Sequence, residues 1–318
     1  MQDIIGIDIS KDRLDAFRLS DRQHNAFGND KAGFKALLKW IGSAEGLRIV
    51  YEPTGPYHRG MEAALADVGH ALVKVNPRQA RRFAEATGTQ AKTDRVDAML
   101  LARMGLALDL PPRPVRGELM NELRELHVAR LALIKDRTAT GNRADTATIG
   151  LIRRQAKARL AIIEKQLAEV DEAITARIAD DPDLAERLGI LTSIPGIGAV
   201  TACMLLIEMP ELGTLEPKQA ASLAGLAPFT RRSGKWKGKE MIRGGRASLR
   251  AAIFMPALVA IRFNADLKRK YQQLIDGGKA PKLAITAVMR KLILLANALL
   301  RDGRKWALLH KSCKGFIS

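Results

Sequence analysis

Ile4-Ile5-Gly6-Ile7-Asp8-Ile9-Ser10 is a short apolar, β-branched stretch near the start of the chain, with one carboxylate inside it. Such a run predicts a buried β-strand. An ionised carboxylate in a buried strand costs free energy unless something pairs with it, and hard divalent cations prefer oxygen ligands. Asp8 is therefore either a metal ligand offered by the first strand of a sheet or a solvent-facing residue of an edge strand.

The residues that follow predict a mixed α/β sheet of the ribonuclease H type. Further strands are expected at residues 13–20, 24–28, 47–51 and 70–75, and helices at 30–41 and from about 57 to 68. Asp30 is an expected helix N-cap, and Asn76-Pro77 predicts the start of a later helix. In this fold, carboxylates from the first strand, a later strand and a following helix meet on one face of the sheet.

Three further carboxylates occur in that order. Glu52 ends the strand at 47–51, and Lys92-Thr93-Asp94-Arg95-Val96-Asp97-Ala98 predicts a helix capped by Thr93. Asp94 and Asp97 are three residues apart and share a helix face, so their repulsion costs free energy unless a cation lies between them. The alternative role, stabilisation of the helix dipole, explains Asp94 better than Asp97.

Four carboxylates in this order fit a two-metal phosphodiester site. In such a site, ions about 3.5–4 Å apart activate the attacking oxygen and stabilise the leaving oxygen. Ligands that are all oxygen predict two Mg²⁺ ions, and Mn²⁺ would substitute for them.

The charge of the chain is concentrated in its last third. The net charge is +18 and the pI is about 10.2, and residues 191–318 carry 22 Lys and Arg against 7 Asp and Glu, a net +15. Such a local excess predicts a nucleic-acid partner more than a basic surface kept for solubility.

Targeting and redox signals are absent from the sequence. Cys203 and Cys313 are too few and too far apart for a disulfide framework or a zinc site. No stretch reaches about 18 consecutive apolar residues, and no signal peptide is expected at the N-terminus. We expect a cytoplasmic bacterial protein, nucleoid-associated when active, with no membrane contact.

The middle of the chain predicts a helical arm. Pro111-Pro112-Arg113-Pro114 indicates a linker, and the proline-free segment that follows, to about Asp180, has apolar residues at helical spacing. Two long helices are expected, forming an antiparallel or an intermolecular coiled coil. The arm is either a structural spacer or, as its length and balanced charge favour, an oligomerisation element.

Two segments beyond the arm are candidates for binding nucleic acid. The turn Ile194-Pro195-Gly196-Ile197-Gly198 is similar to a helix-hairpin-helix element, in which the amides of Gly196 and Gly198 and a helix N-terminus hold a phosphate; the alternative is an ordinary turn between helices. Farther on, a glycine-containing basic segment offers cations for phosphates and one aromatic ring, Trp236, for stacking on a base. Its cations are Arg231, Arg232, Lys235, Lys237, Lys239, Arg243, Arg246 and Arg250.

These motifs resemble a known family. Gly6-Ile7-Asp8, Tyr51-Glu52-Pro53-Thr54-Gly55 and the Lys92–Ala98 element are similar to the Asp-Glu-Asp-Asp domain of bacterial insertion-sequence transposases related to the Piv invertase, whose catalytic domains are similar to the RuvC Holliday-junction resolvase. The resemblance implies that the metal ligands are Asp8, Glu52, Asp94 and Asp97.

The basic segment carries the second half of this resemblance. Its Gly-Leu-Ala-Pro run, its Arg-x-Ser-Gly-Lys segment and its Gly-Gly-Arg before a helix resemble the C-terminal transposase domain of that family, and the family's serine nucleophile maps onto Ser233. Ser248 is the competing serine, although it could simply begin or cap a helix. No base for Ser233 is visible nearby. The family also implies donor and target DNA, a structured guide RNA, and a dimer or tetramer in which carboxylates of one subunit meet the serine of another.

Together these observations predict an α/β domain followed by an all-α part. The expected divisions are a RuvC-like catalytic domain at 1–110, a linker and coiled-coil arm at 111–190, a helical transposase domain at 191–306 and a basic tail at 307–318. The predicted function is that of a transposase, with two alternatives: a junction-resolving endonuclease that uses metal-activated water, and a nucleic-acid-binding scaffold without catalysis.

Overall fold

The computed structural model describes residues 3–42, 46–89, 93–112, 117–229, 232–233, 236–237 and 241–307. The chain forms two compact units, Met1–Gly117 and Glu118–Ser318, called unit 1 and unit 2 below. Unit 2 contains the predicted arm as well as the predicted C-terminal domain, and their separation at residue 190 stays a prediction. The expected basic tail lies outside the described residues from residue 308 onward.

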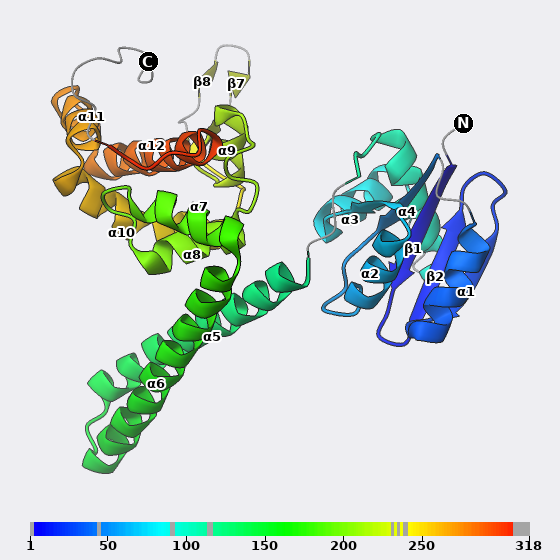
Figure 1. The fold of residues 1–318 in the computed structure, drawn as a ribbon, viewed down its shortest axis with the longest axis horizontal. Coiled ribbons are helices and arrows are strands. Elements are labelled where there is room, and N and C mark those ends of the chain that lie inside the picture. The colour runs from blue at the N-terminus through cyan, green and yellow to red at the C-terminus, as the bar shows by residue number, and fades with distance from the viewer. Residues whose placement is uncertain are drawn as a thin grey trace. The chain divides into compact units, whose positions relative to one another are not determined.

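Unit 1 is a five-stranded mixed sheet with helices on both faces (Figure 1). The strands are β1 (Asp3–Ile9), β2 (Arg13–Arg18), β3 (His24–Gly28), β4 (Leu47–Tyr51) and β5 (Ala71–Lys74), in the order β3-β2-β1-β4-β5. β2 runs antiparallel to β1 and β3, and β4 runs parallel to β1 and β5. The helices are α1 (Lys31–Ile41), α2 (Arg59–Asp67), α3 (Pro77–Ala86) and α4 (Asp94–Ala107). The predicted mixed α/β sheet is confirmed.

Alternation along β1 builds the two faces of this sheet. Ile5 belongs to the core cluster that contains Leu37 of α1, whereas Ile4 belongs to the cluster that contains Leu101 of α4. Gly6 also faces α4, because a Cβ atom there would lie 2.0 Å from the carbonyl oxygen of Ala98. Glycine at this position therefore lets α4 pack directly on the backbone of β1.

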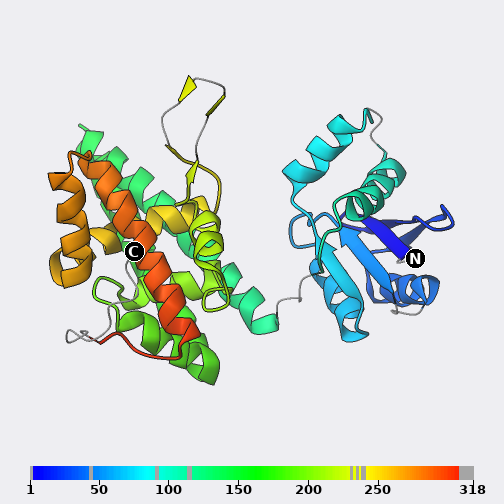
Figure 2. The same cartoon turned by 90° about the horizontal axis from the view of Figure 1, so that it is seen from above.

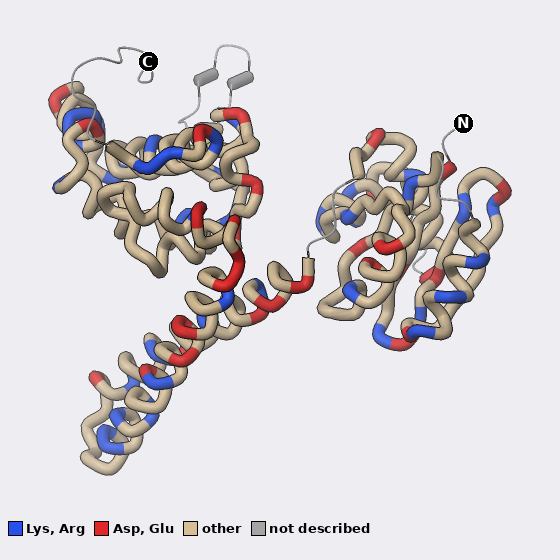
Figure 3. The backbone as a smooth tube through the Cα atoms, in the orientation of Figure 1, with Lys and Arg blue, Asp and Glu red and all other residues tan. Residues whose placement is uncertain are grey.

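Unit 2 begins with a long helical hairpin, α5 (Glu118–Thr146) and α6 (Gly150–Asp180). Ion pairs link Glu122 to Arg177 at 2.8 Å and Arg137 to Glu164 at 3.5 Å, so the two helices run antiparallel. Both helices carry acidic and basic residues, and residues 150–163 of α6 carry only basic ones (Figure 3). An antiparallel hairpin within one chain is one of the two predicted arrangements; a coiled coil between subunits stays a prediction.

The rest of unit 2 is a helical body with short two-residue strands. Its elements are α7 (Pro182–Thr192), α8 (Ala199–Glu208), α9 (Pro217–Leu223), β6 (Pro228–Phe229), β7 (Arg232–Ser233), β8 (Trp236–Lys237), β9 (Met241–Ile242), α10 (Ala247–Phe263), α11 (Ala265–Asp276) and α12 (Pro281–Arg301). By length and composition alone, α12 could cross a membrane, and so could the pair α10 and α11 if a bend of 97° were counted as one span. Leu292 and Ile293 of α12 are nevertheless fully buried in the core of unit 2, where α12 packs against α10 and α11 (Figure 2).

Candidate catalytic site

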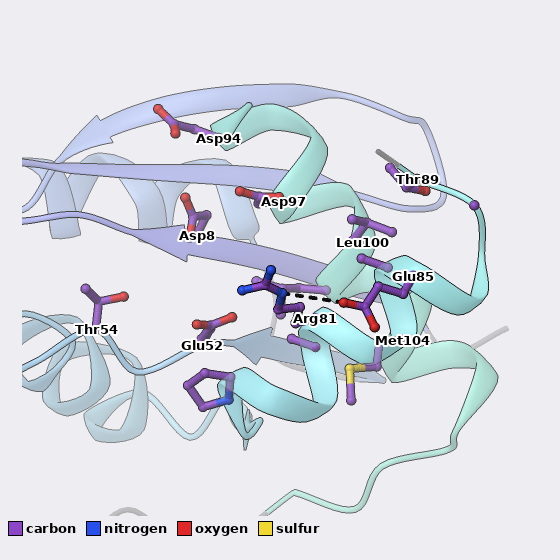
Figure 4. Close-up of a pocket in the computed structure, with 15 residues that line it drawn as sticks. Asp8, Glu52, Thr54, Arg81, Glu85, Thr89, Asp94, Asp97, Leu100 and Met104 are labelled. Atoms are coloured by element: carbon purple, nitrogen blue, oxygen red, sulfur yellow. Dashed lines mark ion pairs between the residues drawn. The ribbon is translucent and has the colours of Figure 1, made fainter. Parts of the chain in front are cut away.

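Four carboxylates from three elements of unit 1 line one cavity (Figure 4). Asp8 lies near the end of β1, Glu52 directly follows β4, and Asp94 and Asp97 lie in the first turn of α4. The two parallel strands end at the same edge of the sheet. Thr93 caps α4 by accepting the backbone N–H of Val96 at 3.3 Å, so the helix begins where its acids reach that edge.

The cavity is wide enough for more than a metal site. It has a volume of about 910 Å³, and α3 forms its second wall. Arg81 of α3 pairs with Glu85 at 3.5 Å, and both residues project into the cavity in Figure 4. Sequence patterns predicted the start of α3 but not its place beside the carboxylates. The residues that complete the lining are Thr54, Pro77, Ala80, Ala84, Gly88, Thr89, Leu100, Leu101 and Met104.

The electrostatics of the cavity favour a cation. The pKa of Asp8 rises from its ordinary value of 3.8 to about 6, because of burial first, then the charges of Asp97 and Asp94, and finally that of Glu52. A donor set made only of carboxylate oxygens suits Mg²⁺ or Mn²⁺. Among the described residues, no three His, Cys, Asp or Glu side chains lie close enough to hold one ion, so the carboxylates surround the cavity without closing on a single point.

The loop that carries the predicted nucleophile runs from Gly225 to Gly245, and its two ends lie close together. A Cβ atom on Gly245 would lie 2.2 Å from the backbone nitrogen of Gly225, and the N–H of Arg246 donates to the carbonyl of Leu223 at 2.9 Å. Both glycines have positive φ, 69° for Gly225 and 62° for Gly245. The backbones at the two ends of the loop therefore lie in direct contact. Glycine is needed at Gly225 and Gly245, because a side chain at either position would clash with the opposite backbone.

Within this loop, β7 and β8 pair as an antiparallel hairpin in which Ser233 lies opposite Trp236 and Arg232 lies opposite Lys237. In Figures 1 and 2 this hairpin lies outside the helical body of unit 2. Three of the predicted phosphate-binding residues lie outside the described part of the chain: Arg231, Lys235 and Lys239.

The remaining predicted cations differ in their partners. Both terminal nitrogens of Arg246 donate to the carboxylate of Glu211, at 2.9 and 2.7 Å. Arg250 donates to the carbonyls of Gly225 and Gly244, at 3.2 and 2.8 Å. These two arginines therefore fasten the loop base, whereas Arg243 is exposed. Their phosphate contacts stay predictions.

The two glycines of the turn before α8, Gly196 and Gly198, have different surroundings. A Cβ atom on Gly196 would lie 2.7 Å from the carbonyl oxygen of Pro256 in α10, so this glycine is needed for packing between helices. Gly198 is the exposed N-cap of α8, and a Cβ atom there would meet nothing within 4 Å. Of the pair, Gly198 is the one that leaves a helix N-terminus open to an anion.

Ser248 has an interior partner that the sequence did not reveal. Its hydroxyl donates to Oε2 of Glu208 at 3.0 Å, and Oε1 of the same carboxylate lies 3.1 Å from Nε2 of His127. The hydrogen bond from His127 is the largest cause that lowers the pKa of Glu208. Because His127 is 81 positions from Glu208, no local motif could have predicted the contact. Ser248 thus ties α10 to α8 and α5.

Comparisons with known proteins cover both units. Residues 5–147 match a transposase model, that of the DEDD domain of IS110 elements, and residues 188–272 match the model of the Transposase IS116/IS110/IS902 family. The pilin gene-inverting proteins of Moraxella bovis and Moraxella lacunata are each 32% identical over 94% of this chain and 96% of their own length. An uncharacterized 43.6 kDa protein of insertion element IS110 from Streptomyces coelicolor is 31% identical over 50% of this chain and 38% of its own length.

Proposed function

The chain belongs to the IS116/IS110/IS902 family of transposases, enzymes that cleave and rejoin DNA, and we propose that it does so with the carboxylates of unit 1 and a serine of unit 2. The observation that carries this proposal is the convergence of Asp8, Glu52, Asp94 and Asp97 on one cavity. A cavity of about 910 Å³ with exposed walls can admit a DNA strand as well as ions.

The four carboxylates are the proposed ligands of two Mg²⁺ ions, or of Mn²⁺. Asp8 and Glu52 would hold the ions from the sheet, and Asp94 and Asp97 would hold them from α4. The chemistry that such ions supply when bound is neutralisation of charge on the scissile phosphate and stabilisation of the leaving oxygen. The raised pKa of Asp8 supports this assignment, because burial first and then the charges of the other three acids raise it, and a bound cation would offset both by stabilising the ionised carboxylate.

Ser233 is the proposed nucleophile. Its hydroxyl oxygen forms a bond to the phosphorus, the bond to the DNA leaving oxygen breaks, and the hydroxyl proton leaves with a base. The resulting phosphoserine ester conserves the energy of the phosphodiester, so a DNA hydroxyl can later displace the serine and rejoin a strand. The neighbouring cations Arg231, Arg232 and Lys235 would stabilise the charge on the phosphate as it reacts.

The partners of the proposed reaction are donor DNA, target DNA and a structured guide RNA encoded by the element. Residues 191–318, with a net charge of +15, would bind the phosphates of these nucleic acids without reading bases. We further propose a dimer or tetramer in which carboxylates and serine come from different subunits, and we expect it in the cytoplasm.

A trapped covalent adduct tests the proposal. With DNA, Mg²⁺ and any required RNA, the wild-type protein should form a DNA linkage that survives denaturation. Ser233→Ala should lose this linkage while still binding DNA and Mg²⁺, and Ser248→Ala should keep it. Loss of the adduct in Ser248→Ala alone would move the nucleophile to Ser248. Cutting by the wild type without any adduct would favour a junction-resolving endonuclease that uses water.

A further inference from the structure

Asp15 is a buried carboxylate that the mechanism above does not use. It lies directly opposite Asp8 in the antiparallel pairing of β1 with β2, and Phe17 lies opposite Gly6. Phe17 packs in the cluster formed with α4, so alternate residues of β2, including Asp15 and Arg13, share the sheet face that carries Asp8. Asp15 retains only 3% of its exposure.

Asp15 fixes the orientation of the exposed Arg13 side chain through two hydrogen bonds. Its two oxygens accept hydrogen bonds from Nε and Nη2 of Arg13, both at 2.8 Å, and Nε2 of His24 lies 3.0 Å from Oδ1. The side chain of Arg13 is 55% exposed, whereas that of Asp15 is 4% exposed. Among the residues that the structure describes, none is hydrogen-bonded to Nη1 of Arg13, so part of the guanidinium fork faces solvent.

Arg13 lies at the same end of the sheet as the four carboxylates. Its backbone closes the turn after β1, with the N–H of Ser10 donating to its carbonyl at 2.9 Å. The pKa of Arg13 is raised by its hydrogen bond with Asp15 first, then by the charge of Asp15, and also by the charge of Asp94 on α4. Arg13 does not line the cavity itself, but its charge acts on Asp94, one of the four acids that do.

A purely structural role explains this arrangement poorly. An ion pair with an exposed partner contributes little to stability, whereas removing a carboxylate from water is costly. A buried carboxylate that fixes an exposed guanidinium is useful if the guanidinium must point at a ligand. The planar fork of arginine matches the oxygens of a phosphate, and an approaching DNA strand brings phosphates toward four acids that would otherwise repel it.

We propose that Arg13 binds a phosphodiester group of the DNA strand that enters the carboxylate cavity, and that Asp15 and His24 are the residues that position it. The inference deepens the proposed function and rests on it for the identity of the ligand. Arg13 would contact a phosphate beside the scissile one, on the β2 side of the cavity. Arg13 is therefore a substrate-binding residue, and it is not a metal ligand.

Chemical protection tests the contact without requiring cleavage. The full-length protein is saturated with a 30-base-pair DNA duplex in Ca²⁺, with binding checked by fluorescence anisotropy, and arginines are modified with phenylglyoxal and quantified by mass spectrometry. DNA should slow modification of Arg13 about 10-fold, as expected for a charged hydrogen bond. Arg22, exposed in the turn between β2 and β3, should react equally with and without DNA. Equal reactivity of Arg13 in both states would overturn the proposal.

A phosphate scan tests the role in the reaction. Each phosphate flanking the cleavage site is replaced in turn by a neutral methylphosphonate, and strand cleavage is timed. One replacement should slow the wild type about 10- to 100-fold, and the same replacement should have no further effect in Arg13→Ala or Asp15→Asn. Arg13→Lys, which keeps the charge but loses the fork, should restore only part of the rate.

The control for this scan is Lys35→Ala, which removes an exposed cation on α1, across the sheet from the cavity. It should give the wild-type pattern. Mg²⁺ affinity, measured by calorimetry, should be no weaker in Arg13→Ala than in the wild type, because Arg13 holds no ion and its positive charge opposes a bound cation. If each methylphosphonate slows cleavage by Arg13→Ala as much as it slows cleavage by the wild type, the inference is refuted. If Arg13 is protected by DNA but the wild type never cuts, the proposed function fails and the DNA contact stands.

Discussion

Replacement of Asp8 by asparagine should stabilise the metal-free protein at neutral and alkaline pH, although it removes a proposed metal ligand. In the folded chain without metal, the Asp8 carboxylate is half-buried and lies among three other acids, which raises its pKa from 3.8 to about 6. The folded state therefore opposes ionisation of Asp8 more than the unfolded state does. Asparagine has nearly the same shape and no charge to be repelled.

The magnitude follows from the pKa. Each pH unit by which a pKa rises corresponds to about 1.4 kcal/mol, so a rise to about 6 corresponds to about 3 kcal/mol for an unscreened group. Because Asp8 is partly exposed, solvent screening reduces this to about 1–2 kcal/mol. The sign depends on pH, since the raised pKa means that the folded state binds more protons than the unfolded state between pH 4 and 6. Wild-type stability is therefore lost as pH rises through this window, and the advantage of Asp8→Asn grows over the same range.

Hydrogen exchange provides a local measurement. The free energy of opening is obtained in EDTA from the amides of β1 and β4, at pH 8 and at pH 4, with intrinsic exchange rates corrected for pH. Asp8→Asn should exceed the wild type by about 1–2 kcal/mol at pH 8 and by close to nothing at pH 4. Saturating Mg²⁺ should reverse the order at pH 8, because only the wild type keeps the complete ligand set.

The matched control is Asp12→Asn in the exposed turn between β1 and β2. It removes the same charge four residues away and should change stability by less than about 0.5 kcal/mol at either pH. If Asp8→Asn is less stable than the wild type at pH 8 in EDTA, or if its advantage is as large at pH 4, then the carboxylates do not repel one another as the geometry implies.

Three further expectations concern other parts of the molecule. Glu52→Gln, Asp94→Asn and Asp97→Asn should each abolish recombination in a donor–target plasmid assay while leaving RNA binding intact; full activity in two of them would contradict a two-metal site. DNA affinity of the full chain should fall at least about 10³-fold between 50 and 200 mM salt, and a fragment of residues 118–318 should bind DNA more tightly than one of residues 1–117 at 150 mM salt. Gly6→Ala should destabilise unit 1 by about 3 kcal/mol or more in urea unfolding, because its Cβ would overlap the carbonyl of Ala98.

The parts of the fold that depend on neighbouring residues were predictable. Asp30 caps α1 by accepting the N–H of Gly33 at 2.7 Å, and Thr93 caps α4, as their sequence positions indicate. The meeting of Asp8 and Glu52 was also predictable, because β1 and β4 are parallel and end at the same edge. Strand ends were less predictable: β2 was expected to reach residue 20 but ends at Arg18, where the hydrogen bond from the N–H of Arg18 to the carbonyl of Gln23 closes the turn to β3.

Contacts that depend on register or tertiary packing were not predictable. Asp15 can be placed beside Asp8 only when the pairing of β1 with β2 is known, and one residue of slip would turn it to the opposite face. The contact of Glu208 with His127 requires the docking of α8 on α5. The basic composition of its segment predicted a phosphate contact for Arg246. In the structure Arg246 donates to the carboxylate of Glu211, a distant partner that composition does not reveal.

The pinched base of the loop between Gly225 and Gly245 has a consequence for how such proteins diversify. The loop ends are joined by backbone packing and by Arg250, and Leu226 and Ile242, close to those ends, pack in the core of unit 2. The entropy of closing a loop grows only logarithmically with its length, by about 0.6 kcal/mol for each doubling. Insertions between the paired strands β6 and β9, away from these core residues, are therefore expected to cost little folding free energy. We expect that this part of the segment can be lengthened or exchanged to change how strongly the protein binds nucleic-acid phosphates while the helical scaffold stays constant.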